Sequence, residues 1–294
     1  MTFYDFQTTT FGKWILAGEH AVLRGKAALV FPVKQKKLQL DFKASAANLS
    51  SSYEGDTGSD IHLLFWSVLE HGQQLLGKSL NEVSGHFHLY CDIPVGAGMG
   101  ASAALCVAMA RWFVAQKLLN VGSVFAFAKN LEDLFHGKSS GLDIAGVSTE
   151  LGIYFQNGKI SPLSQNWQPQ WYLSNCGQVG ITSHCINQVK EIWQADSLKA
   201  SGIDERMHKA VLKAQQALTQ DESAIQQLKE ALDEALNCFK AWGLISETLE
   251  NHMTILTQQG ALACKPTGSG GGGYVLSLWD RKPTNDLAME LIAL

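Results

Sequence analysis

The stretch Asp92-Ile-Pro-Val-Gly-Ala-Gly-Met-Gly-Ala-Ser-Ala-Ala104 joins the end of a strand, a glycine-rich loop and the small-residue start of a helix. Glycines let a backbone turn tightly and approach a phosphate, while unpaired N–H groups and the dipole at a helix N-terminus favour negative charge. A structural glycine turn before a packed helix is the alternative, and three glycines alone would favour it. The stretch is not a Walker A loop, but it predicts an anion site if other segments support one.

Outward from this stretch, the first half of the chain mixes strand and helix patterns. Alternating or continuous apolar residues indicate strands, and apolar residues three or four apart indicate helices. Strands are expected at Ala28–Val33, Lys37–Phe42 and Gly85–Cys91, and helices at Ile61–Leu76 and from Ala101 to about Leu118. These elements predict a mixed α+β fold.

The second half of the chain reads as mainly helical. A helix is expected over Ser246–Gln259, closed by Gly260. A further helical stripe, with apolar residues three or four apart, consists of Ile225, Leu228, Leu232, Ala235 and Leu236. Turn-forming residues gather at 157–170, so we expect one domain over residues 1–165 and a second over residues 166–294.

A second glycine cluster, Lys265-Pro-Thr-Gly-Ser-Gly-Gly-Gly-Gly-Tyr274, lies between strands expected at Ala261–Lys265 and Tyr274–Leu278. The cluster formally contains GxGxxG, but a dinucleotide-binding fingerprint must open a helix, and a β-rich segment follows here. Ordering so many glycines costs much conformational entropy, so an ordered loop indicates close backbone approach to another group. A flexible surface loop is the alternative interpretation.

Composition excludes several functional classes. The 294 residues are 46% hydrophobic and 17% charged, which indicates an ordered protein of one large or two moderate domains. A net charge of −4 with scattered Lys and Arg argues against nucleic-acid binding. The sequence contains no transmembrane or signal-peptide pattern, so we expect a cytoplasmic protein without a membrane partner. The six cysteines lack CxxC spacing and are expected to be reduced and mostly buried.

Four segments carry a family resemblance. Gly12-Lys-Trp-Ile-Leu-Ala-Gly-Glu-His-Ala-Val-Leu-Arg-Gly25 resembles the first motif of mevalonate kinases, in which a lysine precedes GEHAV and a glycine. Pro94 to Ala104 resembles their phosphate loop PxGAGLGSSAA, and Lys265 to Gly273 resembles KxTGAGGGG. Glu132-Asp-Leu-Phe-His-Gly-Lys-Ser-Ser-Gly-Leu-Asp143 is similar to the stretch in which a glutamate precedes HGxPSGxD. On these motifs, the chain is identified as a GHMP superfamily kinase most similar to mevalonate kinase.

The resemblance implies a fold and a set of cofactors. It implies an α+β, two-domain GHMP kinase fold, with an N-terminal ribosomal-protein-S5-like α/β domain and a C-terminal ferredoxin-like α+β domain. The active site would lie in the cleft between the domains. ATP and Mg²⁺ would be the cofactors.

Carried over position by position, the resemblance also assigns the site residues. Asp143 would be the catalytic aspartate, with Lys13 beside it and near the acceptor hydroxyl, while Ser102 and Glu132 would approach Mg²⁺. The main-chain amides around the ATP phosphates would come from Gly96, Ala97, Gly98, Met99, Gly100, Ala101, Ser102 and Ala103. The substrate side would consist of Glu19, His20 and Thr182 in the acceptor pocket and Gly268, Gly270 and Gly271 over the reacting phosphates.

The chain departs from the family pattern at four places. Ala101 replaces the first serine of the phosphate loop, which removes a hydroxyl but keeps the amide, and Ser139 replaces the proline of HGxPSGxD. Gly180 stands where mevalonate kinases often have a basic residue, and Lys265-Pro266 is more like phosphomevalonate kinase. These departures leave the identity of the acceptor open.

The expected activity is phosphoryl transfer from ATP to a small-molecule alcohol, with mevalonate as the first candidate. Asp143 would accept the alcohol proton while Lys13 stabilises negative charge on the oxygen. A buried Lys–Asp ion pair of purely structural role is the alternative. Phosphomevalonate kinase and sugar kinase activities are the runners-up. A non-catalytic relative is the candidate from another class, although its usual mark would be the loss of Lys13 or Asp143. The oligomeric state stays open, with a homodimer as one option.

Overall fold

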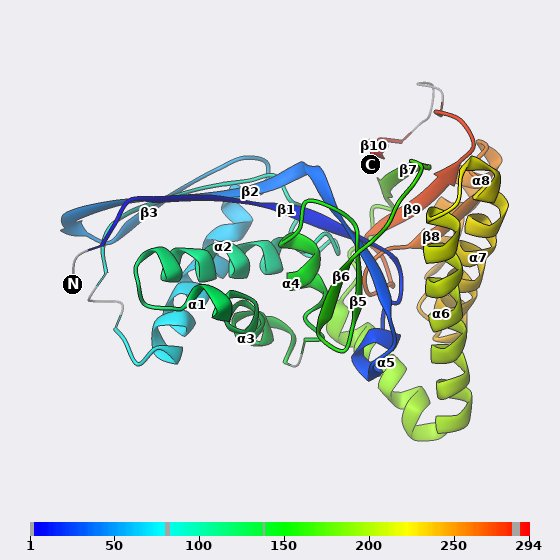
Figure 1. Cartoon of the computed structure of the whole chain (residues 1–294), viewed down its shortest axis with the longest axis horizontal. Helices are drawn as coiled ribbons and strands as arrows, with labels where there is room; N and C mark the ends of the chain where they lie inside the picture. Colours follow the sequence, from blue (N-terminus) through cyan, green and yellow to red (C-terminus); the bar gives the residue numbers. More distant parts are fainter. Residues whose placement is uncertain (1–2, 80–82, 138, 284–288) are drawn as a thin grey trace. The chain divides into compact units, whose positions relative to one another are not determined.

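The computed structural model describes residues 3–79, 83–137, 139–283 and 289–294 and divides into two compact units (Figure 1). The first unit consists of Met1–Lys13, Pro32–Val95 and Met99–Glu150. The second consists of Trp14–Phe31, Gly96–Gly98 and Leu151–Leu294. Each unit is built from three separate chain segments. The two domains expected over residues 1–165 and 166–294 therefore stay a prediction.

A sheet backed by helices makes up the first unit. Strand β4 (Ser84–Cys91) pairs in parallel with β3 (Ser50–Glu54) and antiparallel with β2 (Ala28–Asn48), and β1 (Phe6–Ala17) also pairs with β2. Residues of β4 alternate between buried and half-buried, which is the pattern of a strand with one covered face. The helices of this unit are α1 (Gly58–Leu75), α2 (Ala101–Ala115), α3 (Val124–His136) and α4 (Leu142–Val147).

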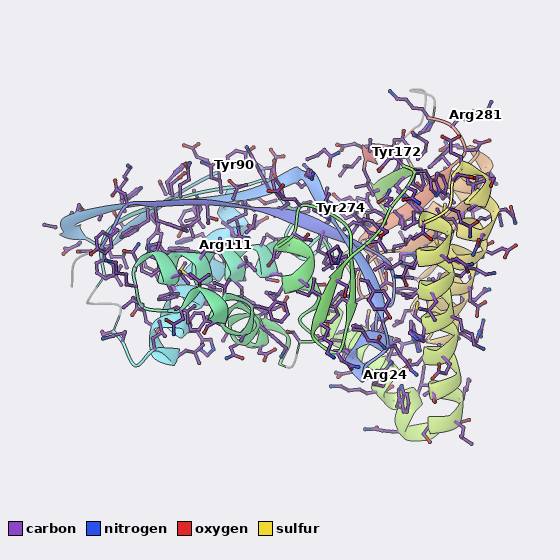
Figure 2. The ribbon with its side chains drawn as sticks, viewed as in Figure 1. Arg24, Tyr90, Arg111, Tyr172, Tyr274 and Arg281 are labelled. Atoms are coloured by element: carbon purple, nitrogen blue, oxygen red, sulfur yellow. The ribbon has the colours of Figure 1, made fainter. Side chains whose placement is uncertain are left out.

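The core of the first unit is rich in aromatic residues. Phe42 of β2 and Phe87 of β4 are partners in the strand register, with ring centroids 4.5 Å apart. Trp112 of α2 lies 5.3 Å from the Phe42 ring and 5.1 Å from the Phe87 ring. Arg111, labelled in Figure 2, donates to the Thr9 carbonyl of β1 at 3.0 Å. These contacts hold α2 against the sheet and thereby fix the direction of its first turn.

The second unit contains a sheet with strand order β10-β7-β9-β8. Its strands are β7 (Gln170–Asn175), β8 (Ala263–Pro266), β9 (Tyr274–Trp279) and β10 (Ile292–Ala293), and its helices are α5 (Thr182–Ala195), α6 (Ser197–Leu218), α7 (Ile225–Ala241) and α8 (Glu247–Gln258). A hairpin of β5 (Ile153–Gln156) and β6 (Lys159–Pro162) pairs with the start of β2. Tyr172 of β7 and Tyr274 of β9 are labelled in Figure 2.

The apolar side of α8 covers this second sheet. Leu249, Met253 and Leu256 are buried with Val275 and Trp279 of β9 in one cluster. Ser246 caps the helix, since its hydroxyl accepts from the Leu249 N–H. Strands β8 and β9 are antiparallel, with Lys265 opposite Leu276. The glycine-rich segment is therefore the connection of a β-hairpin.

Most predicted elements are confirmed, and one prediction needs correction. The helices at 61–76, 101–118, 225–236 and 246–259 and the strands at 85–91, 261–265 and 274–278 match α1, α2, α7, α8, β4, β8 and β9. The two strands expected at 28–33 and 37–42 form one continuous strand, β2. Its first residues pair with β5 and its later residues with β4, and Pro32 falls between these two ladders.

Two further expectations from composition can be compared with the structure. All six cysteines are free, and all except Cys176 are buried, as predicted. No helix within the described ranges is long and apolar enough to cross a membrane.

Candidate functional site

The first glycine-rich loop adopts left-handed backbone at alternate residues. Gly96, Gly98 and Gly100 have φ values of 73°, 84° and 80°, a region that side chains with a Cβ enter only at a cost. Gly100 immediately precedes α2, so its conformation turns the chain into that helix. Gly96–Gly98 belong to the second unit, and Met99 and the first turn of α2 belong to the first. The eight residues predicted to surround the phosphates, Gly96 to Ala103, thus comprise the glycine-rich loop and the first residues of α2.

The two glycine-rich segments, far apart in the sequence, meet in the second unit. A Cβ placed on Gly98 would lie 3.2 Å from the carbonyl oxygen of Thr267. A Cβ placed on Gly273 would lie 2.9 Å from the carbonyl oxygen of Ala97. The absence of side chains therefore lets main chain pack against main chain, as a loop built around a phosphate requires.

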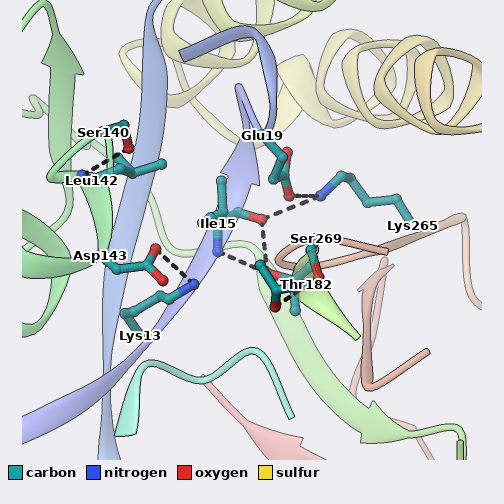
Figure 3. Close-up of polar contacts among 10 residues, drawn as sticks. Lys13, Ile15, Glu19, Ser140, Leu142, Asp143, Thr182, Lys265 and Ser269 are labelled. Carbon is teal, nitrogen blue, oxygen red and sulfur yellow. Dashed lines mark hydrogen bonds and ion pairs between the residues drawn. The ribbon is translucent and has the colours of Figure 1, made fainter. Parts of the chain in front are cut away.

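Lys13 and Asp143 form an ion pair in the first unit (Figure 3). Lys13 Nζ lies 2.9 Å from Asp143 Oδ1, with the Lys13 side chain 2% exposed and the Asp143 side chain 35% exposed. The Lys13 main-chain N–H donates to the Met99 carbonyl at 2.9 Å, and a Cβ on Gly100 would lie 3.0 Å from Lys13 Cγ. The first glycine-rich loop thus packs on the Lys13 stem, and the exposed part of the pair is the Asp143 carboxylate.

Glu132 of α3 is a buried carboxylate in the same unit. Burial and, to a smaller extent, the nearby Asp143 carboxylate raise its pKa to about 8, against the lowering effects of Ser139 and Lys13. Among the described residues, no group donates a hydrogen bond to its Oε2. Two carboxylates near one ammonium group leave an excess of negative charge when both are ionised. A cation would offset that excess.

The residues of this unit fit a magnesium ion on chemical grounds. Mg²⁺ is commonly held by one or two carboxylates, with substrate phosphates and waters completing its shell. Glu132 offers an oxygen without a hydrogen-bond donor, and the half-buried Ser102 lies in the first turn of α2. In the part of the chain that the structure describes, no group of three His, Cys, Asp or Glu side chains could hold a metal by itself. The donor set therefore fits a metal that also takes ligands from a phosphate.

A second lysine–carboxylate pair lies in the second unit and is fully buried. Lys265 Nζ is 2.5 Å from Glu19 Oε1, and the two side chains are 0% and 2% exposed. Lys265 also donates to the Ile15 carbonyl at 3.3 Å and lies 5.2 Å from the Phe239 ring centroid. Figure 3 shows the pair beside Ile15. Its contacts tie the end of β1 to the strand that leads into the second glycine segment.

His20 links the GEHAV motif to the same glycine segment. The Ala21 N–H donates to the Glu19 carbonyl at 2.6 Å around His20, whose φ and ψ are 57° and −49°, so His20 is the centre of a strained γ-turn. Its Nε2 lies 2.8 Å from the Ser269 carbonyl oxygen. A carbonyl only accepts, so we assign the proton to Nε2. Burial lowers the His20 pKa to about 4, which keeps the ring neutral at pH 7.

The loop before α5 also reaches the second glycine segment. The Thr182 hydroxyl lies 3.3 Å from the Ser269 hydroxyl. A Cβ on Gly180 would lie 2.6 Å from the Gly270 carbonyl oxygen. A basic side chain at position 180 would therefore require the loop to shift. Close packing of the two loops explains the glycine at this departure.

The structure brings together several predicted residues and adds partners that the sequence did not reveal. The contacting segments of the second unit carry the predicted residues Glu19, His20, Thr182, Gly268, Gly270 and Gly271. The first unit carries the other four side chains, with Lys13 on β1, Asp143 on α4, Glu132 on α3 and Ser102 on α2. Lys265 and Thr267 were assigned no role. A lysine between apolar residues of a strand signals a buried partner. Lys138 of the fourth motif lies outside the described residues.

Comparison with known proteins finds one matching family and several related sequences. Residues 64–149 match the family described as GHMP kinases N terminal domain. A mevalonate kinase of Pyrococcus horikoshii is 27% identical over 293 residues, covering 90% of this chain and 86% of the relative. The matched range contains the first glycine-rich stretch and the segment Glu132–Asp143.

Solved structures show the same fold over nearly the whole chain. An L. major mevalonate kinase in complex with R-mevalonate has a TM-score of 0.77 at 21% identity, covering 96% of this chain and 88% of its own. A Lactococcus lactis galactokinase complexed with galactose has a TM-score of 0.76 at 13% identity, covering 95% and 86%. Since both superpose equally well, the fold by itself does not select the acceptor. In its N-terminal domain match, its related sequences and its α+β fold, this chain is therefore similar to mevalonate kinases and to other GHMP kinases.

Proposed function

We propose that this chain transfers the γ-phosphoryl group of ATP to the 5-hydroxyl of mevalonate. Support for the acceptor comes from the GEHAV motif, from Glu132 at its interval before HGxxSGxD, and from the sequence likeness to mevalonate kinases. Support for phosphate binding comes from the meeting of the two glycine-rich segments.

The observation that carries the proposal is the Lys13–Asp143 ion pair. Phosphoryl transfer depends mainly on positioning and charge stabilisation, and an alcohol is a weak nucleophile unless a base takes its proton. The Asp143 carboxylate is partly exposed and can accept that proton. Lys13, held by the main chain and by Gly100, would stabilise negative charge on the attacking oxygen. A buried structural pair would not leave a third of its carboxylate exposed.

The glycine-rich segments would bind the triphosphate. In the proposal, the amides of Gly96 to Ala103 wrap the phosphates, and Gly268, Gly270 and Gly271 lie over the reacting groups. Their glycine content is what main-chain approach to a phosphate demands. Glu19, His20 and Thr182 would shape the acceptor pocket, with His20 donating from Nε2 to the glycine segment rather than to the acceptor.

Ser102 and Glu132 would hold Mg²⁺, which supplies charge neutralisation for the transferred phosphoryl group when bound. Glu132 is suited to this role because its carboxylate is buried beside Asp143 and gains from a nearby cation. The Asp143 carboxylate then remains available to accept the alcohol proton.

An ATP-consumption panel tests the proposal. The purified chain is assayed with mevalonate, phosphomevalonate, homoserine, galactose and related sugars, and we expect turnover with mevalonate. Turnover of phosphomevalonate or a sugar but not mevalonate would reject the acceptor and keep the kinase assignment. No turnover with any alcohol would favour the non-catalytic, ligand-binding alternative.

A further inference from the structure

The second glycine segment needs outside contacts to keep one conformation. Gly268, Gly270, Gly271 and Gly273 have φ values between 72° and 96°, and Gly272 has a φ of 159°. Such residues lose more conformational freedom on ordering than any others, so the loop cannot supply its own rigidity. The groups that bind it therefore decide how well it is prepared for a ligand.

Gln178, in the loop before α5, makes two hydrogen bonds to this segment. Its main-chain carbonyl accepts from the Gly273 N–H at 2.7 Å. Its side-chain Nε2 donates to the Gly271 carbonyl at 3.0 Å. A Cβ on Gly272 would lie 2.6 Å from the Gln178 carbonyl oxygen, so the two main chains are in close contact. Gln178 thus holds the segment on both sides of Gly272.

The same glutamine is itself fixed by helix α8. The Ser246 hydroxyl donates to Gln178 Oε1 at 3.1 Å, and that hydroxyl also accepts from the Leu249 N–H at the start of the helix. Both ends of the Gln178 amide are therefore engaged, which sets its orientation. A chain of contacts runs from a helix packed on the sheet, through Ser246 and Gln178, to the glycine segment.

We propose that Gln178 is a positioning residue that holds the second glycine segment in the conformation used to bind the nucleotide phosphates. This inference rests on the proposed function, because it takes the segment to be part of the ATP site. Gln178 touches the loop rather than the substrate. Gln178 would change nucleotide affinity by changing the fraction of molecules whose loop already has the binding conformation. The apparent affinity falls as that fraction falls.

Direct nucleotide binding tests the proposal without requiring turnover. The Kd of a non-hydrolysable ATP analogue with Mg²⁺ is measured by calorimetry for the parent and for Gln178→Leu, which removes both side-chain contacts. We expect the Kd to rise about 5-fold, the order expected from one net hydrogen bond. Gln178→Glu keeps the acceptor for Ser246 but places a carboxylate against the Gly271 carbonyl, so its Kd should rise further.

Controls separate loop positioning from general damage. Gln156→Leu removes a similar contact in the same unit, from Gln156 Nε2 to the Gly25 carbonyl at 3.2 Å, and should leave the Kd unchanged. With mevalonate as acceptor, the KM for ATP should rise in the Gln178 variants while kcat at saturating ATP stays within about twofold. Hydrogen exchange of residues 268–274 should be faster in those variants. If Gln178→Leu fails to fold, Gln178→Asn, whose amide is one methylene too short, replaces it.

The outcomes distinguish this inference from the proposed function. A folded Gln178 variant with parental Kd overturns the inference, even if its loop exchanges faster, because the contact is then only structural. A parent that binds the analogue but phosphorylates no alcohol rejects the proposed acceptor while the Kd comparison still decides the role of Gln178. A parent that binds no nucleotide overturns both.

Discussion

Two lysine–carboxylate pairs in this chain share their chemistry and differ in their surroundings. In the first unit Lys13 is buried but the Asp143 side chain is 35% exposed, whereas in the second unit Lys265 and Glu19 are at most 2% exposed. A partly exposed carboxylate can receive a proton from a ligand, while a fully buried pair mainly fixes the segments that carry it. Exposure of the acid therefore separates a pair suited to chemistry from a pair suited to holding a loop.

The largest expected effect is on the fully buried pair. Glu19→Gln removes the carboxylate charge beside the buried Lys265 ammonium and should lower the free energy of unfolding by about 3–5 kcal/mol. Asp143→Asn should lower it by only about 1 kcal/mol, because the aspartate is partly exposed and Glu132 still acts on Lys13. Urea unfolding measures both. Equal losses of unfolding free energy in the two variants would show that the two pairs do not differ in structural role.

The next effect is a dependence of stability on pH that comes from His20. The pKa of His20 is about 4 in the folded chain and about 6.5 in the unfolded chain. Between these two pH values the unfolded chain binds a proton at His20 and the folded chain does not. The resulting stability is fully present above pH 6.5 and is lost as the pH falls towards 4, by about 3 kcal/mol in total.

His20→Asn isolates that contribution, since asparagine tolerates positive φ and does not titrate. Unfolding free energies at pH 7 and pH 4.5 should differ less in the variant than in the parent. His252, half-buried and bonded to Ser174, is a matched control, because burial lowers its pKa as well. Parallel pH curves for the parent and His20→Asn would show that the ring is not buried as a neutral group.

The smallest expected effect concerns magnesium. Ser102→Ala and Glu132→Gln should each raise the Mg²⁺ concentration needed for half-maximal rate by about 10-fold, the scale of losing one supporting group at a metal site. Ser148→Ala, which removes a hydroxyl that donates to the Ile144 carbonyl of α4, should not change it. Parental magnesium dependence in both site variants would show that the metal takes other ligands.

Local sequence patterns predicted the parts of the fold that local chemistry determines. The glycine stretch before α2, the apolar stripe of α7 and the Ser246 start of α8 were recognised because caps, periodicity and glycines act over a few residues. Strand β1 was not predicted, because its sequence contains Gly12 and Lys13, residue types that are depleted in strands, and both are buried in the structure.

The partners within each unit could not be predicted from such patterns. Glu19 and Lys265 are separated by 246 positions, and Ile15 and Thr267 by 252. Nothing near either lysine in the sequence indicates that one carboxylate partner is exposed and the other buried. The family resemblance supplied Lys13 and Asp143, and only the folded chain distinguishes their pair from the pair of Lys265.

The proposed role of Asp143 as the base is tested most directly by kcat for Asp143→Asn, with ATP affinity and circular dichroism measured on the same protein. Asparagine keeps the shape but loses the basic oxygen, so kcat should fall about 10²-fold or more while ATP affinity changes little. Lys13→Met should lower kcat by a similar factor, and the double variant by less than the product, because the two side chains act together. A folded Asp143→Asn protein with near-parental kcat would contradict the account and leave the Lys13–Asp143 pair as a structural contact.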